Sequence, residues 1–164
     1  MPARKQEITK LLMQSARNEQ AEIIYALHRM GLEEAGNWSA DPTLDSDLMD
    51  IEYHYAAPGI FLLALMEDGQ LAGMAALRPC GDDVFEVKRM RVAQPLRGRG
   101  IGRQLLATLI EHARRHGARQ LLLDTARSQV AAQRLYRQFG FVNIASAMIG
   151  GIDSLLYRLD LSPP

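Results

Sequence analysis

Apolar positions change their spacing several times along the chain, and each change marks an expected element. Spacing of three or four residues predicts helices at 18–30, 44–55, 102–116 and 129–139. Alternating or continuous apolar runs predict strands at 7–13, 60–66, 71–77, 85–92, 118–124, 141–149 and 154–161. Helices mixed with mostly antiparallel strands, and one strand–helix–strand crossover, indicate an α/β fold of three layers. We expect a single domain over residues 1–164.

Turn-forming residues separate these segments. Gly31 is expected to end the first helix, and residues 32–41 read as a loop. Asp68-Gly69 is a strong hairpin signal between the strands at 60–66 and 71–77. Residues 79–83 are expected to form a turn.

One strand breaks its own alternation. Its apolar residues Phe85, Val87, Met90 and Val92 are spaced two, three and two apart. One extra residue near Lys88-Arg89 predicts a β-bulge, which would leave backbone groups free to bind a ligand. The alternative is a regular short strand whose register is misread.

A glycine-arginine loop follows this strand. Gly98, Gly100 and Gly102 allow tight bending and close approach of a ligand to the backbone. The next helix directs its free N–H groups and positive dipole end into the loop. The loop arginines, which add full charges, are Arg97, Arg99 and Arg103. This combination predicts a phosphate or pyrophosphate site.

Three kinds of phosphate loop compete for this segment. A nucleoside triphosphate loop needs Gly-Lys-Ser/Thr, whereas Gly102 is followed by Arg103-Gln104. A dinucleotide loop needs a third glycine, which is missing, although Asp124 lies at about the right distance for the acidic residue. The acyl-CoA pattern, Arg/Gln-x-x-Gly-x-Gly/Ala, matches residues 97–102 at every specified position.

With this loop, the chain resembles the GNAT superfamily of N-acetyltransferases. The resemblance runs from about Val84 to Val142 and includes the strand at 85–92. It also includes residues 132–141, which are similar to the family's A-x-x-L-Y-x-x-x-G-F helix and turn. Loop, strand and Tyr-Gly-Phe segment in this order are a specific combination.

The resemblance implies a GNAT-like fold whose fourth strand splays from the next one to admit the pantetheine arm of acetyl-CoA. The residues that it places on the cofactor are Met90, Arg91, Val92, Arg97, Gly98, Arg99, Gly100, Ile101, Gly102, Arg103 and Gln129. The backbone N–H groups of residues 90–92 would polarise the thioester carbonyl. Two positions depart from the family's usual pattern, because Gln129 replaces an Asn and Arg91 replaces a Tyr.

Two side chains are candidates for acid and base in acetyl transfer to a primary amine. Tyr136 occupies the position of the family's acid, which protonates the departing thiolate. Glu86 alternates with buried Phe85 and Val87, so it faces the other side of the strand and could take the amine proton through a water. A solvated or Lys88-paired Glu86 and a core Tyr136 are the structural alternatives, and a catalytically silent acyl-CoA-binding regulatory domain is the alternative function. His54 is a weaker candidate for the base.

Charge is uneven although the net charge is zero. Residues 33–52 carry seven carboxylates and no Lys or Arg, whereas residues 97–137 carry nine Arg against two carboxylates. The basic part suits an anionic cofactor, and the acidic part either attracts a cationic acceptor or consists of solvated and helix-capping carboxylates. The acceptor itself, a small-molecule or peptide amine, is left open.

Features that are missing from the sequence bear on the other partners and on the compartment. Arginines without interleaved aromatic residues do not predict nucleic-acid binding. No apolar run is long enough for a membrane span, no secretory signal is visible, and no metal-ligand spacing appears. The single cysteine, Cys80, fits a reducing compartment, so we expect a cytoplasmic protein without a metal. The last two strands are the candidate surface for a homodimer.

Overall fold

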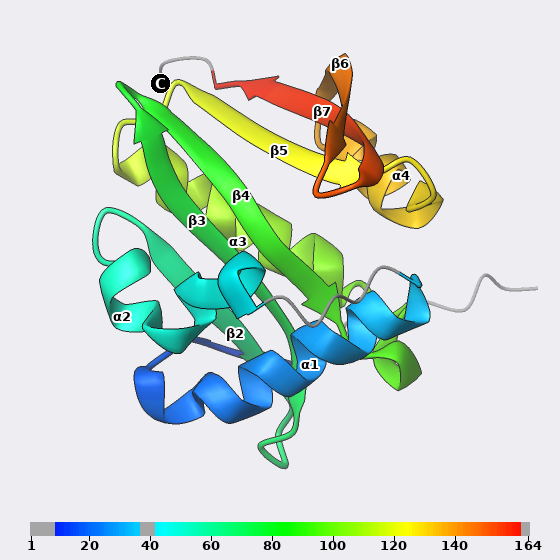
Figure 1. Ribbon diagram of the computed structural model, residues 1–164. Helices are drawn as coiled ribbons and strands as arrows, with labels where there is room; N and C mark the ends of the chain where they lie inside the picture. Colours follow the sequence, from blue (N-terminus) through cyan, green and yellow to red (C-terminus); the bar gives the residue numbers. More distant parts are fainter. Residues whose placement is uncertain (1–8, 37–41, 162–164) are drawn as a thin grey trace, which may run out of the picture.

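A seven-stranded sheet organises the computed structural model, which describes residues 9–36 and 42–161 (Figure 1). The strands are β1 (Leu12–Ser15), β2 (Ile60–Leu65), β3 (Leu71–Gly81), β4 (Val84–Val92), β5 (Gln120–Ala126), β6 (Val142–Ile149) and β7 (Ile152–Asp160). Their order across the sheet is β1-β2-β3-β4-β5-β7-β6. Among the strands of the described residues, only β4 and β5 pair in parallel, because α3 connects them as a crossover.

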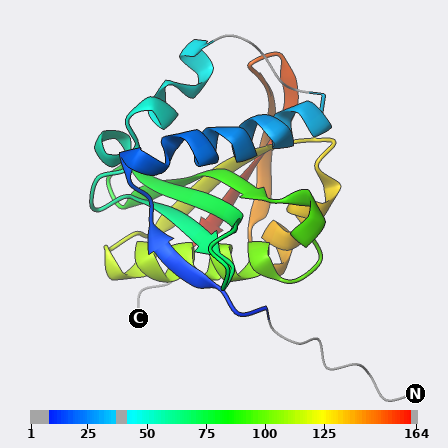
Figure 2. The ribbon, with the colours of Figure 1, turned by 90° about the horizontal axis from the view of Figure 1, so that it is seen from below.

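Helices cover both faces of the sheet. The helical segments are η1 (Asn18–Gln20), α1 (Ala21–Glu34), η2 (Pro42–Met49), α2 (Ile51–His54), η3 (Gln94–Leu96), α3 (Ile101–Arg115) and α4 (Val130–Gln138), where η marks a 3₁₀ helix. In Figure 2, α1 lies above the sheet and α3 below it. The expected three-layer α/β architecture is therefore confirmed.

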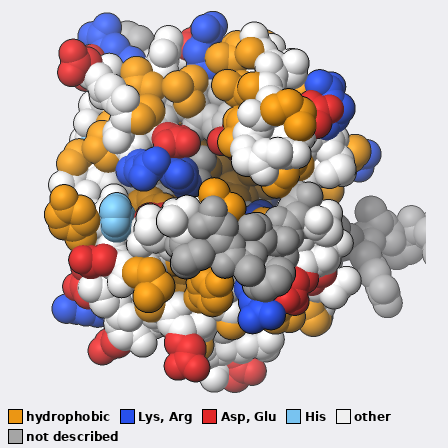
Figure 3. All heavy atoms as spheres, viewed as in Figure 1, with side chains coloured by type: hydrophobic (Ala, Val, Ile, Leu, Met, Phe, Trp, Pro, Cys, Tyr) orange, Lys and Arg blue, Asp and Glu red, His pale blue; other side chains and the backbone are white. Residues whose placement is uncertain are grey.

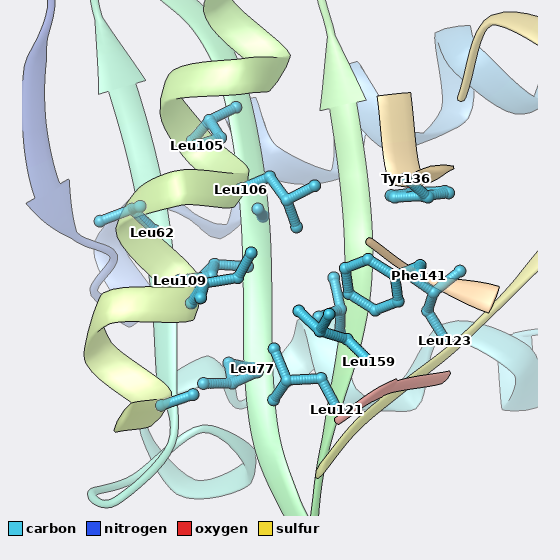
Figure 4. Packing of buried hydrophobic residues seen from close by; sticks show 14 of the residues in the cluster. Leu62, Leu77, Leu105, Leu106, Leu109, Leu121, Leu123, Tyr136, Phe141 and Leu159 are labelled. Atoms are coloured by element: carbon cyan, nitrogen blue, oxygen red, sulfur yellow. The ribbon is translucent and has the colours of Figure 1, made fainter. Parts of the chain in front are cut away.

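The buried core is divided between the two faces. On one face, Leu105, Leu106 and Leu109 of α3 pack on the sheet with no exposed surface (Figure 4). Their spacing of one and three residues forms the apolar stripe of an amphipathic helix. On the other face, Ile24 of α1 and Leu48 of η2 pack against Leu63 and neighbouring strand residues. Alternating side chains of β2 and β3 supply both layers, and β4 adds Phe85 and Val87 to the layer under α3.

Two predicted helices differ from the structure. Gly31 does not end the first helix, since α1 continues to Glu34. The predicted helix at 44–55 is a 3₁₀ segment, η2, that is kinked at Asp45, followed by the single turn of α2. Asp50 accepts the backbone N–H of Tyr53 and so begins α2. Side-chain capping and the kink override the helical spacing of this segment.

Strand boundaries also shift. β3 continues through Pro79 to Gly81, so the predicted turn at 79–83 shrinks to Asp82-Asp83. β1 begins at Leu12, so the predicted strand at 7–13 is wrong for residues 9–11, whereas residues 7 and 8 lie outside the described part of the chain. The last two strands form a hairpin around Gly150-Gly151, both at positive φ. β6 forms a sheet edge with exposed Val142 and Met148, and a homodimer through it stays a prediction.

Candidate active site

The bulge predicted in β4 is present and lies next to the separation of two strands. Met74 pairs with Arg91 and Ala76 with Lys88, so two β4 residues, Arg89 and Met90, lie opposite Ala75 alone. Arg89 has a positive φ of 57°, which is unusual for a side chain of its size. β4 and β5 pair only from Val84 to Glu86 and then diverge. The expected splayed strand pair is therefore confirmed.

The divergence opens a cleft of about 330 Å³. Figure 3 shows a hollow near the middle of the face seen in Figure 1, with hydrophobic side chains inside it and charged side chains at its rim. The lining residues are His28, Leu32, Leu44, Val87, Lys88, Arg89, Met90, Arg91, Asp124, Thr125, Ala126, Gln129, Ala132, Tyr136, Ile149, Ile152 and Ser154. Tyr136, Met90, Arg91 and Gln129, all named from the sequence, thus meet in one cleft, whereas Glu86 does not line it.

The glycine loop joins the end of β4 to α3. Gly98 and Gly100 have φ of 77° and 79°, and a Cβ on either would meet nothing within 4 Å. Open space above a positive-φ backbone is what close ligand approach requires. The first backbone bond of α3 runs from the N–H of Gln104 to the oxygen of Gly100 (3.1 Å), so the N–H groups of residues 101–103 precede it and have no acceptor inside the helix. The loop therefore fits an anionic phosphate group.

Gly102 and Ile101 serve packing instead. A Cβ on Gly102 would lie 3.3 Å from Leu135 and 3.7 Å from Val92. The Ile101 side chain is 1% exposed and belongs to the core. These two residues offer a ligand only their backbone.

The three loop arginines differ in their surroundings. Arg97 pairs with Glu34 at 2.7 Å and donates to the Val92 oxygen at 3.1 Å. Arg103 donates to Gln138 and lies over the Phe139 ring, 5.2 Å from its centroid. Among the described residues, Arg99 has no side-chain partner, which leaves its charge available to a phosphate.

Tyr136 of α4 lines the cleft and also lies beside Phe141 in the core, as Figure 4 shows for the core side. Its ring is 6% exposed and packs edge-on against Phe141, with 5.8 Å between the centroids. Its hydroxyl lies 3.8 Å from the Met90 sulfur. Burial raises the pKa of Tyr136 to about 12, against the opposing charge of Arg91. The phenol therefore keeps its proton at neutral pH.

Two carboxylates lie on the same side of the sheet beside the cleft. Glu86 pairs with Arg78 at 3.4 Å rather than with Lys88. Asp124 lines the cleft, two residues beyond Leu122, which is the β5 partner of Glu86. Partial burial raises the pKa of Asp124, the Glu86 carboxylate adds to the rise, and Lys88 opposes it. The alternation that placed Glu86 also places Asp124, because Leu121 and Leu123 are buried on the opposite face.

A buried ionic cluster supports the wall of the cleft. Arg89 donates to Asp45 at 2.9 Å, to Asp47 at 3.0 Å and to the Leu44 oxygen at 3.1 Å. Burial alone would raise the pKa of Asp47, but hydrogen bonds from Arg89 and Tyr55 hold it below its ordinary value. This cluster fixes η2 against the bulge of β4, at the point where the strand leaves β5.

His28 completes the cluster from α1. Its side chain is 3% exposed, and its Nε2 lies 2.9 Å from Asp45 and 3.1 Å from Arg89. Burial and the charge of Arg89 lower its pKa to about 4, against the raising effect of Asp45. His28 is therefore neutral at pH 7. No local pattern predicted this cluster, since its members come from three separate segments of the chain.

The acidic segment at 33–52 mostly has structural partners. Asp45 and Asp47 bind Arg89, and Asp50 caps α2. Glu34 pairs with Arg97, and Asp41 lies outside the described residues. These contacts support the alternative of capping and paired carboxylates over a surface that attracts a cationic acceptor.

Comparison with known proteins settles the family. The model of the acetyltransferase (GNAT) family matches residues 24–141. The chain belongs to the GNAT family. A GNAT acetyltransferase of Staphylococcus aureus Mu50 has the same fold, with a TM-score of 0.84 at 21% identity over 93% of this chain and 100% of that one. The sheet excludes the dinucleotide alternative, because a doubly wound fold needs several parallel neighbours and the described strands have one parallel pair.

The sequence relatives of this GNAT chain include proteins named N-acetyltransferases. An uncharacterised N-acetyltransferase of Schizosaccharomyces pombe is 31% identical over 134 residues, which is 80% of this chain and 82% of that protein. The N-acetylaspartate synthetase of Rattus norvegicus is 34% identical over 107 residues, 63% of this chain. The chain spans about a third (36%) of that synthetase's length.

Two features are absent from the described residues. No helix there is long and apolar enough to cross a membrane. No three His, Cys, Asp or Glu side chains in that part of the chain are grouped to hold a metal ion.

Proposed function

We propose that this GNAT protein transfers the acetyl group of acetyl-CoA to a primary amine by direct attack. The observation that carries the proposal is the cleft between β4 and β5, which holds a protonated phenol and a carboxylate beside an open glycine loop. A solved relative of similar fold from Salmonella typhimurium is described with its cofactor acetyl-CoA, at a TM-score of 0.74 and 20% identity over 93% of this chain and 95% of that one.

The chain has groups that fit each part of the cofactor. The backbone of Gly98 and Gly100 and the first N–H groups of α3 would hold the pyrophosphate, with the free charge of Arg99 beside them. The diverging edge of β4 at Met90 to Val92, together with Gln129, would hold the pantetheine arm. When bound, acetyl-CoA supplies an activated acyl carbonyl.

In this proposal the proton transfers belong to Tyr136 and to the two carboxylates. Tyr136 gives its proton to the departing sulfur, since its raised pKa keeps it protonated at neutral pH. Glu86 and Asp124 act as a coupled pair that receives the amine proton, directly or through a water. Asp124 is the member that lines the cleft, and partial burial together with the Glu86 charge raises the pKa of Asp124.

The roles of the two carboxylates can be separated by substitution. Asp124→Asn removes the carboxylate that lines the cleft, so kcat should fall about 100-fold or more. Glu86→Gln removes a neighbouring negative charge and should shift the acidic limb of the pH–rate profile to lower pH. The reverse pattern, with the large loss in Glu86→Gln, would make Glu86 the direct base.

The central test is acetyl-CoA binding by calorimetry. Gly100→Asp places a side chain and a negative charge where the pyrophosphate is proposed to bind, so affinity should fall more than 10-fold. Gly117→Asp is the matched control, because its φ of 78° and empty surroundings impose the same backbone strain at the other end of α3. No binding by the wild type would refute the proposed cofactor.

Turnover distinguishes an enzyme from a silent sensor. Thiol release in the presence of an amine panel supports transfer. Micromolar acetyl-CoA binding with no thiol release for any amine would favour the alternative, a regulatory acyl-CoA-binding domain.

A further inference from the structure

Arg91 carries an uncompensated charge in the cleft. Its Nε is buried without a hydrogen-bond partner, and its Nη1 donates to the Met90 oxygen at 3.2 Å. Among the residues that the structure describes, no carboxylate forms an ion pair with it. The guanidinium does not become neutral by losing its proton, because its pKa stays too high for deprotonation even though burial lowers it. Burial of an unpaired charge is costly unless an anion joins it.

Several other ionisable groups around the cleft are paired or neutral. Arg89 is neutralised by Asp45 and Asp47, and Glu86 is paired with Arg78. His28 is neutral, and the charge of Arg91 is one of the causes that lower its pKa. Arg91 and Lys88 therefore remain as cations, and Asp124 as an anion, on the wall of the same cleft.

Helix α1 packs against the Arg91 side chain and holds it in place. A Cβ on Gly31 of α1 would lie 2.8 Å from the Arg91 Cδ and 2.9 Å from its Nε. The glycine inside α1 therefore makes room for the arginine stem to lie against the helix. A stem packed in this way loses less freedom when its guanidinium binds a ligand.

The geometry points to an acceptor that carries a carboxylate, bound by Arg91, so that the acetylated amine is an amino acid or a similar zwitterion. The guanidinium matches the planar carboxylate and supplies charge-assisted hydrogen bonds. Asp124, in the same cleft, carries the opposite charge that an amine group needs. This inference rests on the proposed acetyl transfer and adds to it the chemical class of the acceptor.

Matched pairs of acceptors test this inference. The pairs are L-phenylalanine with 2-phenylethylamine, L-histidine with histamine and L-lysine with cadaverine, which differ only in the carboxylate. The wild type should acetylate the amino acid of at least one pair with a kcat/KM at least 10-fold higher than that of its amine. Arg91→Gln should raise the KM of that amino acid about 10- to 100-fold and leave the paired amine within twofold. Acetyl-CoA affinity should not change, because the pantetheine arm is proposed to bind the backbone of residues 90–92, which this side-chain substitution leaves in place.

Arg114→Gln is the control for loss of a positive charge. Arg114 is exposed near the end of α3 and does not line the cleft. It should match the wild type in every arm of the experiment. A parallel calorimetric titration of the same amino acids into CoA-saturated protein measures carboxylate binding without turnover.

The outcomes separate the two proposals. Equal kcat/KM within every pair, or equal losses for acid and amine in Arg91→Gln, would overturn the carboxylate site and leave acetyl transfer standing. Amino-acid binding that Arg91→Gln weakens, in a wild type without thiol release, would overturn acetyl transfer and support the carboxylate site. Neither binding nor turnover for any pair would overturn both.

Discussion

The buried neutral His28 makes the stability of this protein depend on pH in a way that can be calculated. Its folded-state pKa is about 4, against 6.5 for the free side chain. The unfolded chain therefore binds the proton more readily than the folded protein. The stability associated with neutral His28 is fully present above pH 6.5 and is lost as the pH falls toward 4.

The size of the effect follows from the two pKa values. One pKa unit corresponds to about 1.4 kcal/mol, so the limiting loss at low pH is about 3 kcal/mol. By pH 5, His28 is almost fully protonated in the unfolded chain, whereas in the folded protein it remains mostly neutral. The expected loss of unfolding free energy over this interval is about 2 kcal/mol from His28 alone.

Urea unfolding at pH 7 and pH 5, followed by circular dichroism, measures this loss. Other groups also titrate, so the comparison is between the wild type and His28→Gln, which cannot take up the proton. The wild type should lose about 2 kcal/mol more than the variant over this interval. His54→Gln is the control, because His54 is exposed on α2, and its pH dependence should match that of the wild type.

Equal losses in the wild type and in His28→Gln, within about 0.5 kcal/mol, would refute the reasoning. His28 would then be protonated in the folded protein or reached by solvent. Either result would contradict its placement between Arg89 and Asp45, and with it the support of η2 against the bulge.

Three further predictions concern the cleft. Tyr136→Phe should lower kcat about 100-fold or more without changing acetyl-CoA affinity, as measured by steady-state kinetics and calorimetry. Gly31→Ala should favour the helical conformation of α1 by up to about 1 kcal/mol, but its Cβ should displace Arg91. The KM of a carboxylate-bearing acceptor should therefore rise, without a matching fall in the free energy of unfolding measured in urea. Arg89→Met should cost about 3–5 kcal/mol of unfolding free energy, because Asp45 and Asp47 stay buried without their partner; an unchanged urea midpoint would contradict this cluster.

Local patterns in the sequence were enough to predict much of this fold. The interrupted alternation of Phe85, Val87 and Met90 predicted the bulge, and the structure confirms it. The apolar stripe of α3 and its end at Gly117 were also readable, because helical periodicity and positive-φ glycines act within a few residues. The predicted start at Gly102 lies one residue after the observed start at Ile101.

Gly31 shows where local reasoning failed. A glycine at the end of an apolar helical stripe reads as a stop signal, and the sequence contains nothing that says otherwise. Its role depends on Arg91, sixty residues away in the chain, whose stem occupies the space that a Cβ would fill. The same holds for Asp124, which the loop pattern associated with a dinucleotide and the sheet brings into the cleft.

The sequence by itself therefore determined most of the elements, the glycine loop and the family, since these depend on residue type and spacing along the chain. Only the tertiary structure decided which charges are satisfied. Arg89, Arg91 and Arg97 are the same residue type on one short stretch, yet two are paired by carboxylates from distant segments and one is not. Pairing and burial depend on what the fold places nearby, and those contacts are what assign Arg91 to the acceptor.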